Sequence, residues 1–201
     1  LGLKIGLYRD LAVGVGKDSA EYWGNAELFI PGVGAGAPPD AFFPCGQSWG
    51  LGAFSPEKLK DLGYEPFIKI LRANMQGAGA LRIDHVMSLM RLYMLPDNQS
   101  NGTYIYYNFA DMLNIVALES RLNRCVIVGE SIGNVPDGFL DTLQSRNIHS
   151  LSVLWAERAN AGWGGFLAPY DYPTNAFTSV GTHDMPPLKM WWFGYDIQEA
   201  F

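Results

Sequence analysis

The sequence has little cysteine, little charge and few basic residues. Only Cys45 and Cys125 occur among its 201 residues, and neither belongs to a CxxC pair. That scarcity argues against a disulfide framework and a thiolate zinc site, and it predicts a reducing, cytoplasmic location. Lys and Arg number 14 against 20 Asp and Glu, giving a formal net charge of −6. With no basic run, the chain is not expected to bind nucleic acid or an anionic membrane, and a neutral or polar ligand is favoured.

Long apolar stretches are also missing. No run approaches the roughly 20 residues of a membrane-spanning helix, and no charged-then-apolar signal peptide opens the chain. The residues are nevertheless 48% hydrophobic and only 17% charged, which is enough to bury a substantial core. Because the chain starts at Leu1 without a Met, we expect it to be a piece of a longer polypeptide.

Short β-like segments alternate with helical patterns along the chain. The expected strands are rich in Val, Ile or Leu and end in polar residues; they are 3–9, 80–84, 125–130, 150–157 and 176–183. Unbroken apolar runs of this kind are typical of parallel strands covered on both faces. Helical patterns lie between them, over 55–77, 111–124 and 136–147. This alternation predicts βα units, and therefore an α/β protein with a parallel sheet.

Two regions interrupt that alternation. Residues 31–56 are dense in Pro and Gly, so they are predicted to form a long loop inserted in a single catalytic segment over 1–201; long ordered loops are usually functional. In the second region, Asn101-Gly102 precedes the aromatic stretch 103–107, which predicts a tight turn entering a short strand.

Acidic residues stand at, or just after, the carboxyl ends of four of the expected strands. They are Asp10, Asp84, Glu130 and Asp184. In a (β/α) barrel the carboxyl ends of the strands form the active-site face, so these acids would converge there. Each one alone is as compatible with a helix N-cap as with a site. Four together, with little lysine to pair them, favour a site.

Two of these acids have surroundings that suit different protonation states. Arg82 lies two residues before Asp84, so both side chains point to the same side of a strand, where the arginine would keep the carboxylate ionised as a nucleophile. The alternative is an ordinary buried ion pair. Glu130 follows an apolar strand, where desolvation would raise its pKa and suit it to general-acid work. Two such carboxyls are the minimum apparatus for cleaving a glycosidic bond.

Neutral polar groups near the acids suit a carbohydrate ligand. His85 and His183 each stand beside an acid, but no HExxH or similar metal-ligand spacing exists, so no metal or cofactor is expected. Hydrogen bonds to sugar hydroxyls suit both histidines better. Gln47 and Trp49 offer an amide and an indole. The amide can hydrogen-bond to the hydroxyls of a pyranose, and the indole can stack on its C–H face. The alternative for Trp49 is that it only packs its loop onto the barrel.

Seven sequence strings, in order along essentially the whole chain, closely resemble those of the 4-alpha-glucanotransferases, also called amylomaltases or disproportionating enzymes, of the alpha-amylase clan. They are YRDLAVGV (8–15), GAPPD (36–40), GQSWGL (46–51), ALRIDHVM (80–87), ALES (117–120), GE (129–130) and THDMP (182–186). The resemblance implies a (β/α)8 TIM barrel, of which this chain holds about strands 3 to 7. It also implies a cofactor-independent transferase that moves α-1,4-glucan segments between maltooligosaccharides.

The resemblance further implies a role for each candidate residue. Asp84 would be the nucleophile that forms a covalent glycosyl-enzyme, and Glu130 the acid and then the base. Asp184 would bind the sugar at the cleavage point and favour its distorted form. The implied substrate-binding residues are Asp10, Asp40, Gln47, Trp49, Arg82, His85 and His183. Retention by two displacements predicts the two reacting carboxyls about 5 to 5.5 Å apart.

Two other functions compete with glucan transfer. One is a hydrolytic α-amylase or glucosidase of the same clan, and the strings at 36–40 and 46–51 favour the transferase over it. The other is a non-catalytic glucan-binding fragment, which would lack one of the acids. None of the acids is missing here.

Overall fold

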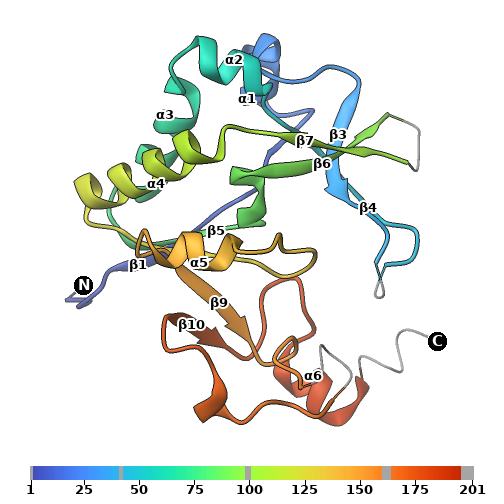
Figure 1. Ribbon diagram of the computed structural model, residues 1–201, viewed down its shortest axis with the longest axis vertical. Helices are drawn as coiled ribbons and strands as arrows, with labels where there is room; N and C mark the ends of the chain where they lie inside the picture. The colour runs from blue at the N-terminus through green and yellow to red at the C-terminus, as the bar shows by residue number, and fades with distance from the viewer. Residues whose placement is uncertain (1, 41–42, 98–100, 160–163, 196–201) are drawn as a thin grey trace. The chain divides into compact units, whose positions relative to one another are not determined.

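The computed structural model describes residues 2–40, 43–97, 101–159 and 164–195 (Figure 1). The chain divides into two compact units, the first ending at Ile148 and the second beginning at His149. That 1–201 act as one catalytic segment stays a prediction.

Three parallel strands of the first unit lie in the order β1-β5-β8. They are β1 (Leu7–Leu11), β5 (Ala78–Ile83) and β8 (Val126–Gly129). In the register of these strands Leu11 lies opposite Ile83, and Ile83 lies opposite Gly129. The three carboxyl ends are therefore level, and the residues that follow them share one edge of the sheet. The strands expected from apolar runs are confirmed, with the first displaced toward Leu11.

Helices follow these strands and cover them. The helices of the first unit are α1 (Ala20–Gly24), η1 (Ala26–Leu28), α2 (Pro56–Asp61), α3 (Glu65–Met75), η2 (Val86–Leu89), α4 (Phe109–Asn123) and α5 (Phe139–Gln144). Helix α3 packs against both α4 and β5 (Figure 1). Leu71 of α3 and Val116 of α4 are fully buried in the same core cluster as Leu81 of β5. Burial of each such side chain stabilises the fold by about 1.5 to 3 kcal/mol.

The single helix predicted over 55–77 is two helices. The Ser55 hydroxyl accepts the Lys58 N–H and caps α2, which begins at Pro56 as expected. Gly63 and Tyr64 then take left-handed φ values of 58° and 61°, and such residues cannot continue an α-helix. The apolar periodicity runs across this break because both helices bury side chains in one core.

Residues 31–56 were predicted as a loop, and this is wrong for two stretches. They contain β3 (Val33–Ala37) and β4 (Gln47–Gly52). A Cβ on Gly36 would lie 2.0 Å from the Gln47 carbonyl oxygen, so this glycine permits close approach of two strands. The dense glycine therefore marked strand contact as well as turns.

Both strands belong to an antiparallel sheet in the order β2-β4-β3-β6-β7. The other members are β2 (Val15–Gly16), β6 (Arg91–Pro96) and β7 (Thr103–Tyr106). Strand β7 follows the Asn101-Gly102 turn signal as predicted, whereas β6 had no counterpart among the predicted strands. Figure 1 shows β6 and β7 running side by side, as their antiparallel pairing requires.

The second unit is smaller and also contains parallel strands. Among its described residues lie β9 (His149–Val153), η4 (Pro169–Asp171), β10 (Ala176–Ser179) and α6 (Leu188–Phe193). Strands β9 and β10 pair in parallel with Ser150 opposite Ala176. Both are shorter than the predicted strands, which ended at 157 and 183.

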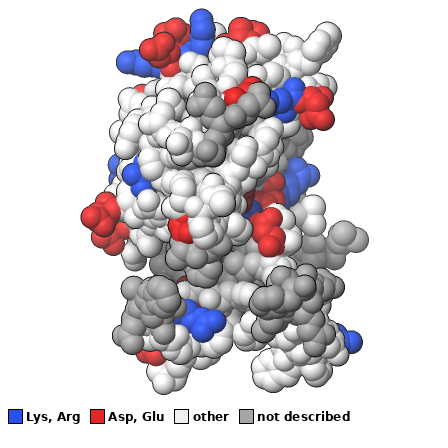
Figure 2. Space-filling model, turned by 90° about the vertical axis from the view of Figure 1, so that its right-hand side faces the viewer, with Lys and Arg blue, Asp and Glu red and all other residues white. Residues whose placement is uncertain are grey.

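Charged side chains are sparse on the face in Figure 2, where Lys and Arg alternate with Asp and Glu and no broad area has one sign. No helix within the described ranges is long and apolar enough to cross a membrane.

Candidate active site

The level ends of β1, β5 and β8 bring three of the predicted acids to one edge. Asp10 lies in β1, while Asp84 and Glu130 directly follow β5 and β8. The Asp84 N–H donates to the Leu11 carbonyl, and the Glu130 N–H to the Ile83 carbonyl, both at 2.9 Å. The hydrogen-bonded ladder therefore extends one residue past the strands and fixes the backbone of both acids.

Arg82 joins two of these carboxylates. Its Nη1 lies 2.7 Å from Asp10 Oδ1, and its Nη2 lies 2.8 Å from Asp84 Oδ1. The arginine side chain is 7% exposed, but the Asp10 and Asp84 side chains are 40% and 31% exposed. The carboxylates are therefore accessible to a ligand, which distinguishes the arrangement from an ordinary buried ion pair. Hydrogen bonds between charged groups of this kind are shorter and stronger than neutral ones, so they hold both carboxylates in place.

Glu130 has the opposite surroundings. Its side chain is buried, and burial is the main cause that raises its pKa above the ordinary value, with the nearby Asp84 charge adding to it. Two backbone N–H groups work against this shift, from Ile132 to Oε1 at 2.6 Å and from His85 to Oε2 at 3.0 Å. The net direction is upward. Burial thus moves the Glu130 carboxyl toward the protonated form, the direction that the apolar strand before it predicted.

His85 connects this edge to the antiparallel sheet. Its ring packs edge-on against the Trp49 ring, with centroids 5.1 Å apart. Trp49 in turn donates from Nε1 to the Gln47 side-chain oxygen at 3.2 Å, because the two residues are two apart on β4 and share a face. Burial, and secondly the charge of Arg91, lower the pKa of His85 to about 4. The structure thus brings the amide, the indole and a neutral imidazole next to the acids.

Asp40 is hydrogen-bonded to Phe43 through both its side chain and its backbone. Its Oδ1 accepts the Phe43 N–H at 2.7 Å, and its own N–H donates to the Phe43 carbonyl at 3.1 Å. Residues 41–42 between them lie outside the described residues. A contact of Asp40 with sugar stays a prediction.

Asp184 and His183 belong to the second unit. His183 Nε2 lies 3.3 Å from Asp184 Oδ1, and both side chains are 65% exposed. The Asp184 N–H donates to the Thr182 hydroxyl at 3.3 Å. These contacts arrange the Thr182-His183-Asp184 string locally, and the roles of both residues in substrate binding stay predictions.

Some contributors to the site were not predicted. Ile132 acts through its backbone N–H, which no residue-type pattern reveals. Arg91 binds the carbonyl and side-chain oxygens of Asn134, which lies in the segment after Glu130. A lone arginine before an apolar stretch gave no signal beyond that of a solvated surface residue.

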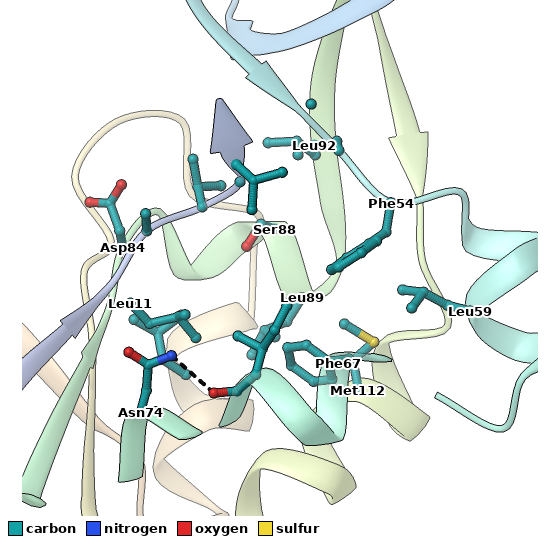
Figure 3. Close-up of a pocket in the computed structure, with 18 of the residues that line it drawn as sticks. Leu11, Phe54, Leu59, Phe67, Asn74, Asp84, Ser88, Leu89, Leu92 and Met112 are labelled. Carbon is teal, nitrogen blue, oxygen red and sulfur yellow. Dashed lines mark hydrogen bonds between the residues drawn. The ribbon is translucent and has the colours of Figure 1, made fainter. Parts of the chain in front are cut away.

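A cavity of about 420 Å³ adjoins the acids from the side of α2 and α3. Asp10 and Asp84 border it, whereas most of its lining is apolar and Glu130 is not part of it. Figure 3 shows Asp84 on one side of the view and Phe54, Phe67 and Met112 on the other. Asp84 therefore lies at the rim of this cavity, and Glu130 lies outside its lining.

Within the part of the chain that the structure describes, no cluster of three or more His, Cys, Asp or Glu side chains could hold a metal ion.

Known proteins share both the sequence and the fold. Residues 1–200 match the family described as 4-alpha-glucanotransferase. The 4-alpha-glucanotransferase of Haemophilus influenzae is 42% identical over 199 residues, which cover 98% of this chain and 28% of that protein. The 4-alpha-glucanotransferase of Mycobacterium tuberculosis is 38% identical over 201 residues, with the same two shares.

Solved structures agree. The amylomaltase from Corynebacterium glutamicum has a TM-score of 0.91 at 35% identity, over 98% of this chain and 28% of that one. The amylomaltase from Streptococcus agalactiae in complex with acarbose shares the fold, with a TM-score of 0.81 at 20% identity. The match covers 97% of this chain and 41% of the amylomaltase chain. The predicted fold class, part of a (β/α) barrel, is confirmed. The chain spans 28% of the length of the first two relatives, and it belongs to the 4-alpha-glucanotransferase family.

Proposed function

We propose that this protein is a 4-alpha-glucanotransferase that moves α-1,4-glucan segments between maltooligosaccharides by a retaining double displacement. The observation that carries the proposal is the pairing of two unlike carboxyls on one sheet edge. Asp84 is bound by Arg82 and accessible, while Glu130 is buried with a raised pKa. Family membership supplies the substrate class.

In the first displacement, the Asp84 carboxylate attacks the anomeric carbon of the donor glucan. The glycosidic C–O bond breaks, and Glu130 gives its proton to the leaving oxygen. The products are a covalent glycosyl-enzyme ester and a shortened glucan. Arg82 contributes by holding Asp84 in its attacking position through the 2.8 Å contact.

In the second displacement, Glu130 is a carboxylate and takes the proton from the 4-hydroxyl of an incoming glucan. That oxygen attacks the anomeric carbon, the ester bond to Asp84 breaks, and both acids return to their starting states. Two inversions leave the α configuration unchanged. The backbone N–H bonds from Ile132 and His85 suit this step, because they stabilise the ionised carboxyl of Glu130.

The remaining predicted residues would bind sugar. From β4, Trp49 would stack on a pyranose and Gln47 would bind its hydroxyls. Asp10 of β1 and His85, which follows β5, would face the same sugar. Asp40, His183 and Asp184 complete the proposed set. A glucan held in acceptor subsites has a high effective concentration, so it outcompetes water for the intermediate.

The proposed partners are maltooligosaccharides and other α-1,4-glucans, with neither nucleic acid nor membrane. The proposed location is the cytoplasm, on the evidence of a two-cysteine composition.

The test is product analysis after incubation of the full-length protein with maltotriose, with Glu130→Gln as the control. Glucose together with a ladder of longer maltooligosaccharides, absent in the control, supports the proposal. Glucose and maltose alone indicate a hydrolase. Glucan binding without turnover indicates a non-catalytic relative and contradicts the proposal.

A further inference from the structure

Arg91 is held between two segments at the start of β6. Its Nη2 donates to the Asn134 backbone carbonyl at 3.3 Å and lies 3.5 Å from the Asn134 side-chain oxygen. Its guanidinium carbon lies 4.2 Å from the centre of the Tyr104 ring on β7, a distance typical of a cation–π contact. These contacts fix the arginine head group, which a solvated surface residue would not require.

Asn134 belongs to the segment that holds Glu130. Ile132, two residues before Asn134, donates its N–H to Glu130 Oε1 at 2.6 Å. Between them Gly133 has a φ of 113°, a conformation that residues other than glycine rarely adopt. The hydrogen bond from Arg91 to the Asn134 carbonyl restrains the segment beyond that residue.

Arg91 also acts on the residue that binds the other oxygen of Glu130. That residue is His85, whose N–H donates to Oε2 at 3.0 Å. The positive charge of Arg91 disfavours a second positive charge on the His85 ring, in addition to the effect of burial.

We propose that Arg91 is a positioning residue for Glu130: it restrains, through Asn134, the segment whose Ile132 N–H binds Oε1 of Glu130. The inference rests on the proposed glucan transfer. In this role Arg91 contacts neither the two reacting carboxyls nor the sugar.

The groups that face Glu130 determine what loss of Arg91 would change. They are the Asp84 carboxylate, which follows β5, the Arg82 guanidinium, which belongs to β5, and the N–H groups of His85 and Ile132. The two N–H groups favour the ionised carboxyl. If the segment loosens, the Ile132 bond weakens, and Glu130 holds its proton to higher pH.

The test uses the full-length enzyme with maltotriose as substrate. Arg91→Gln removes the charge and the fork of donors, and Arg91→Lys keeps the charge and one donor group. Arg121→Gln is the matched control, because Arg121 lies exposed on α4. The measurements are kcat, KM and the pH dependence of kcat, with thermal unfolding to verify the fold of each variant.

Arg91→Gln is expected to lower kcat about tenfold with KM changed less than about twofold, since misplacement of a reacting group affects the chemical step. Its alkaline limb should move to higher pH. Arg91→Lys should recover about a third of the lost rate, because a lysine cannot reproduce the planar fork. Arg121→Gln should behave as the parent enzyme does.

An unshifted alkaline limb in Arg91→Gln, or an equal loss of kcat in Arg121→Gln, overturns the inference. Should Arg91→Gln fail to fold, Arg91→Lys decides: a parental kcat and pH profile then overturns it. A parent enzyme that makes no ladder from maltotriose contradicts the proposed function instead, so the two failures are distinguishable.

Discussion

The backbone N–H of His85 donates to Oε2 of Glu130 at 3.0 Å, across the ends of neighbouring strands β5 and β8. His85 reaches this position with a left-handed φ of 44°, which costs a non-glycine residue about 1 to 2 kcal/mol. The bond therefore depends on a backbone conformation that the surrounding structure maintains. It orients a buried acid whose proton is needed at the sheet edge.

Two buried glutamates of the first unit, Glu130 and Glu119, should differ in how strongly their replacement by glutamine lowers activity. Glu130→Gln removes the proposed acid and base, so transfer from maltotriose should fall by about 10² to 10⁴. The amide NH2 of glutamine cannot accept one of the two backbone N–H bonds that Glu130 receives, so the free energy of unfolding should also fall, by about 1 to 3 kcal/mol. Rate measurements and urea unfolding on one preparation would check both expectations.

Glu119→Gln is the companion to that substitution. Glu119 of α4 is buried and binds Arg72 of α3 through two contacts, Nε to Oε2 at 2.8 Å and Nη2 to Oε1 at 2.7 Å. Loss of its charge should lower the free energy of unfolding by about 1 to 2 kcal/mol, a value reduced by the exposure of Arg72, and leave kcat unaltered. Loss of kcat in this variant would contradict the assignment of Glu119 to stability alone.

The stability cost of Glu119→Gln should depend on pH. Hydrogen bonding to Arg72 lowers the pKa of Glu119, so its contribution is fully present above the unfolded-state pKa and is lost as pH falls through the folded one. Parent and variant should therefore become more alike at acidic pH. Urea unfolding from pH 7 downward would measure the gap, and a gap that stays constant would contradict the ion pair as its source.

His85 should stay neutral well below the usual histidine range. Burial and the charge of Arg91 lower its pKa to about 4, so its ring signals in NMR should not titrate between pH 8 and 5 in the folded protein. The unfolded chain takes up this proton at a higher pH, so the contribution of His85 is present above the unfolded pKa and lost as pH falls toward 4. A titration midpoint near 6.5 would refute the proposed environment of this ring.

Arg82 should be more important for activity than its charge alone implies. Lysine keeps the charge but cannot bind Asp10 and Asp84 through two separate nitrogens of one rigid fork. We expect Arg82→Lys to lower kcat/KM by about 10², with a folded protein by circular dichroism. A lysine variant within a few-fold of the parent enzyme would show that the charge suffices.

The strand ends could be predicted from sequence because they depend on local pattern. An apolar run followed by an acid identified Asp84 and Glu130, and the spacing of Arg82 placed it beside Asp84. Burial around Glu130 followed from the same pattern. These features need only a strand and its covered faces.

The antiparallel sheet could not be predicted in the same way. Its glycines permit close approach of β3 and β4, and Gly36 reads as a loop residue when its neighbour strand is unknown. Consequently the contact of Trp49 with His85 was not predicted, since it joins a residue of β4 to one in the turn after β5. Backbone donors such as Ile132 have no side-chain signature at all.

Gly129, the last residue of β8, should tolerate no side chain. A Cβ there would meet the Cγ1 and Cγ2 atoms of Val86 at 2.9 Å, and Val86 begins η2 directly after His85. Gly129→Ala should therefore push η2 away from β8 and cost about 1 to 3 kcal/mol of unfolding free energy by overpacking. Because His85 moves with η2, its bond to Glu130 should lengthen, and kcat should fall even where the variant remains folded. Gly24→Ala is the control, since a Cβ at that exposed position meets no atom within 4 Å. If Gly129→Ala lost stability but kept kcat at a temperature where it is fully folded, the His85 bond would not be what holds Glu130 in its working orientation.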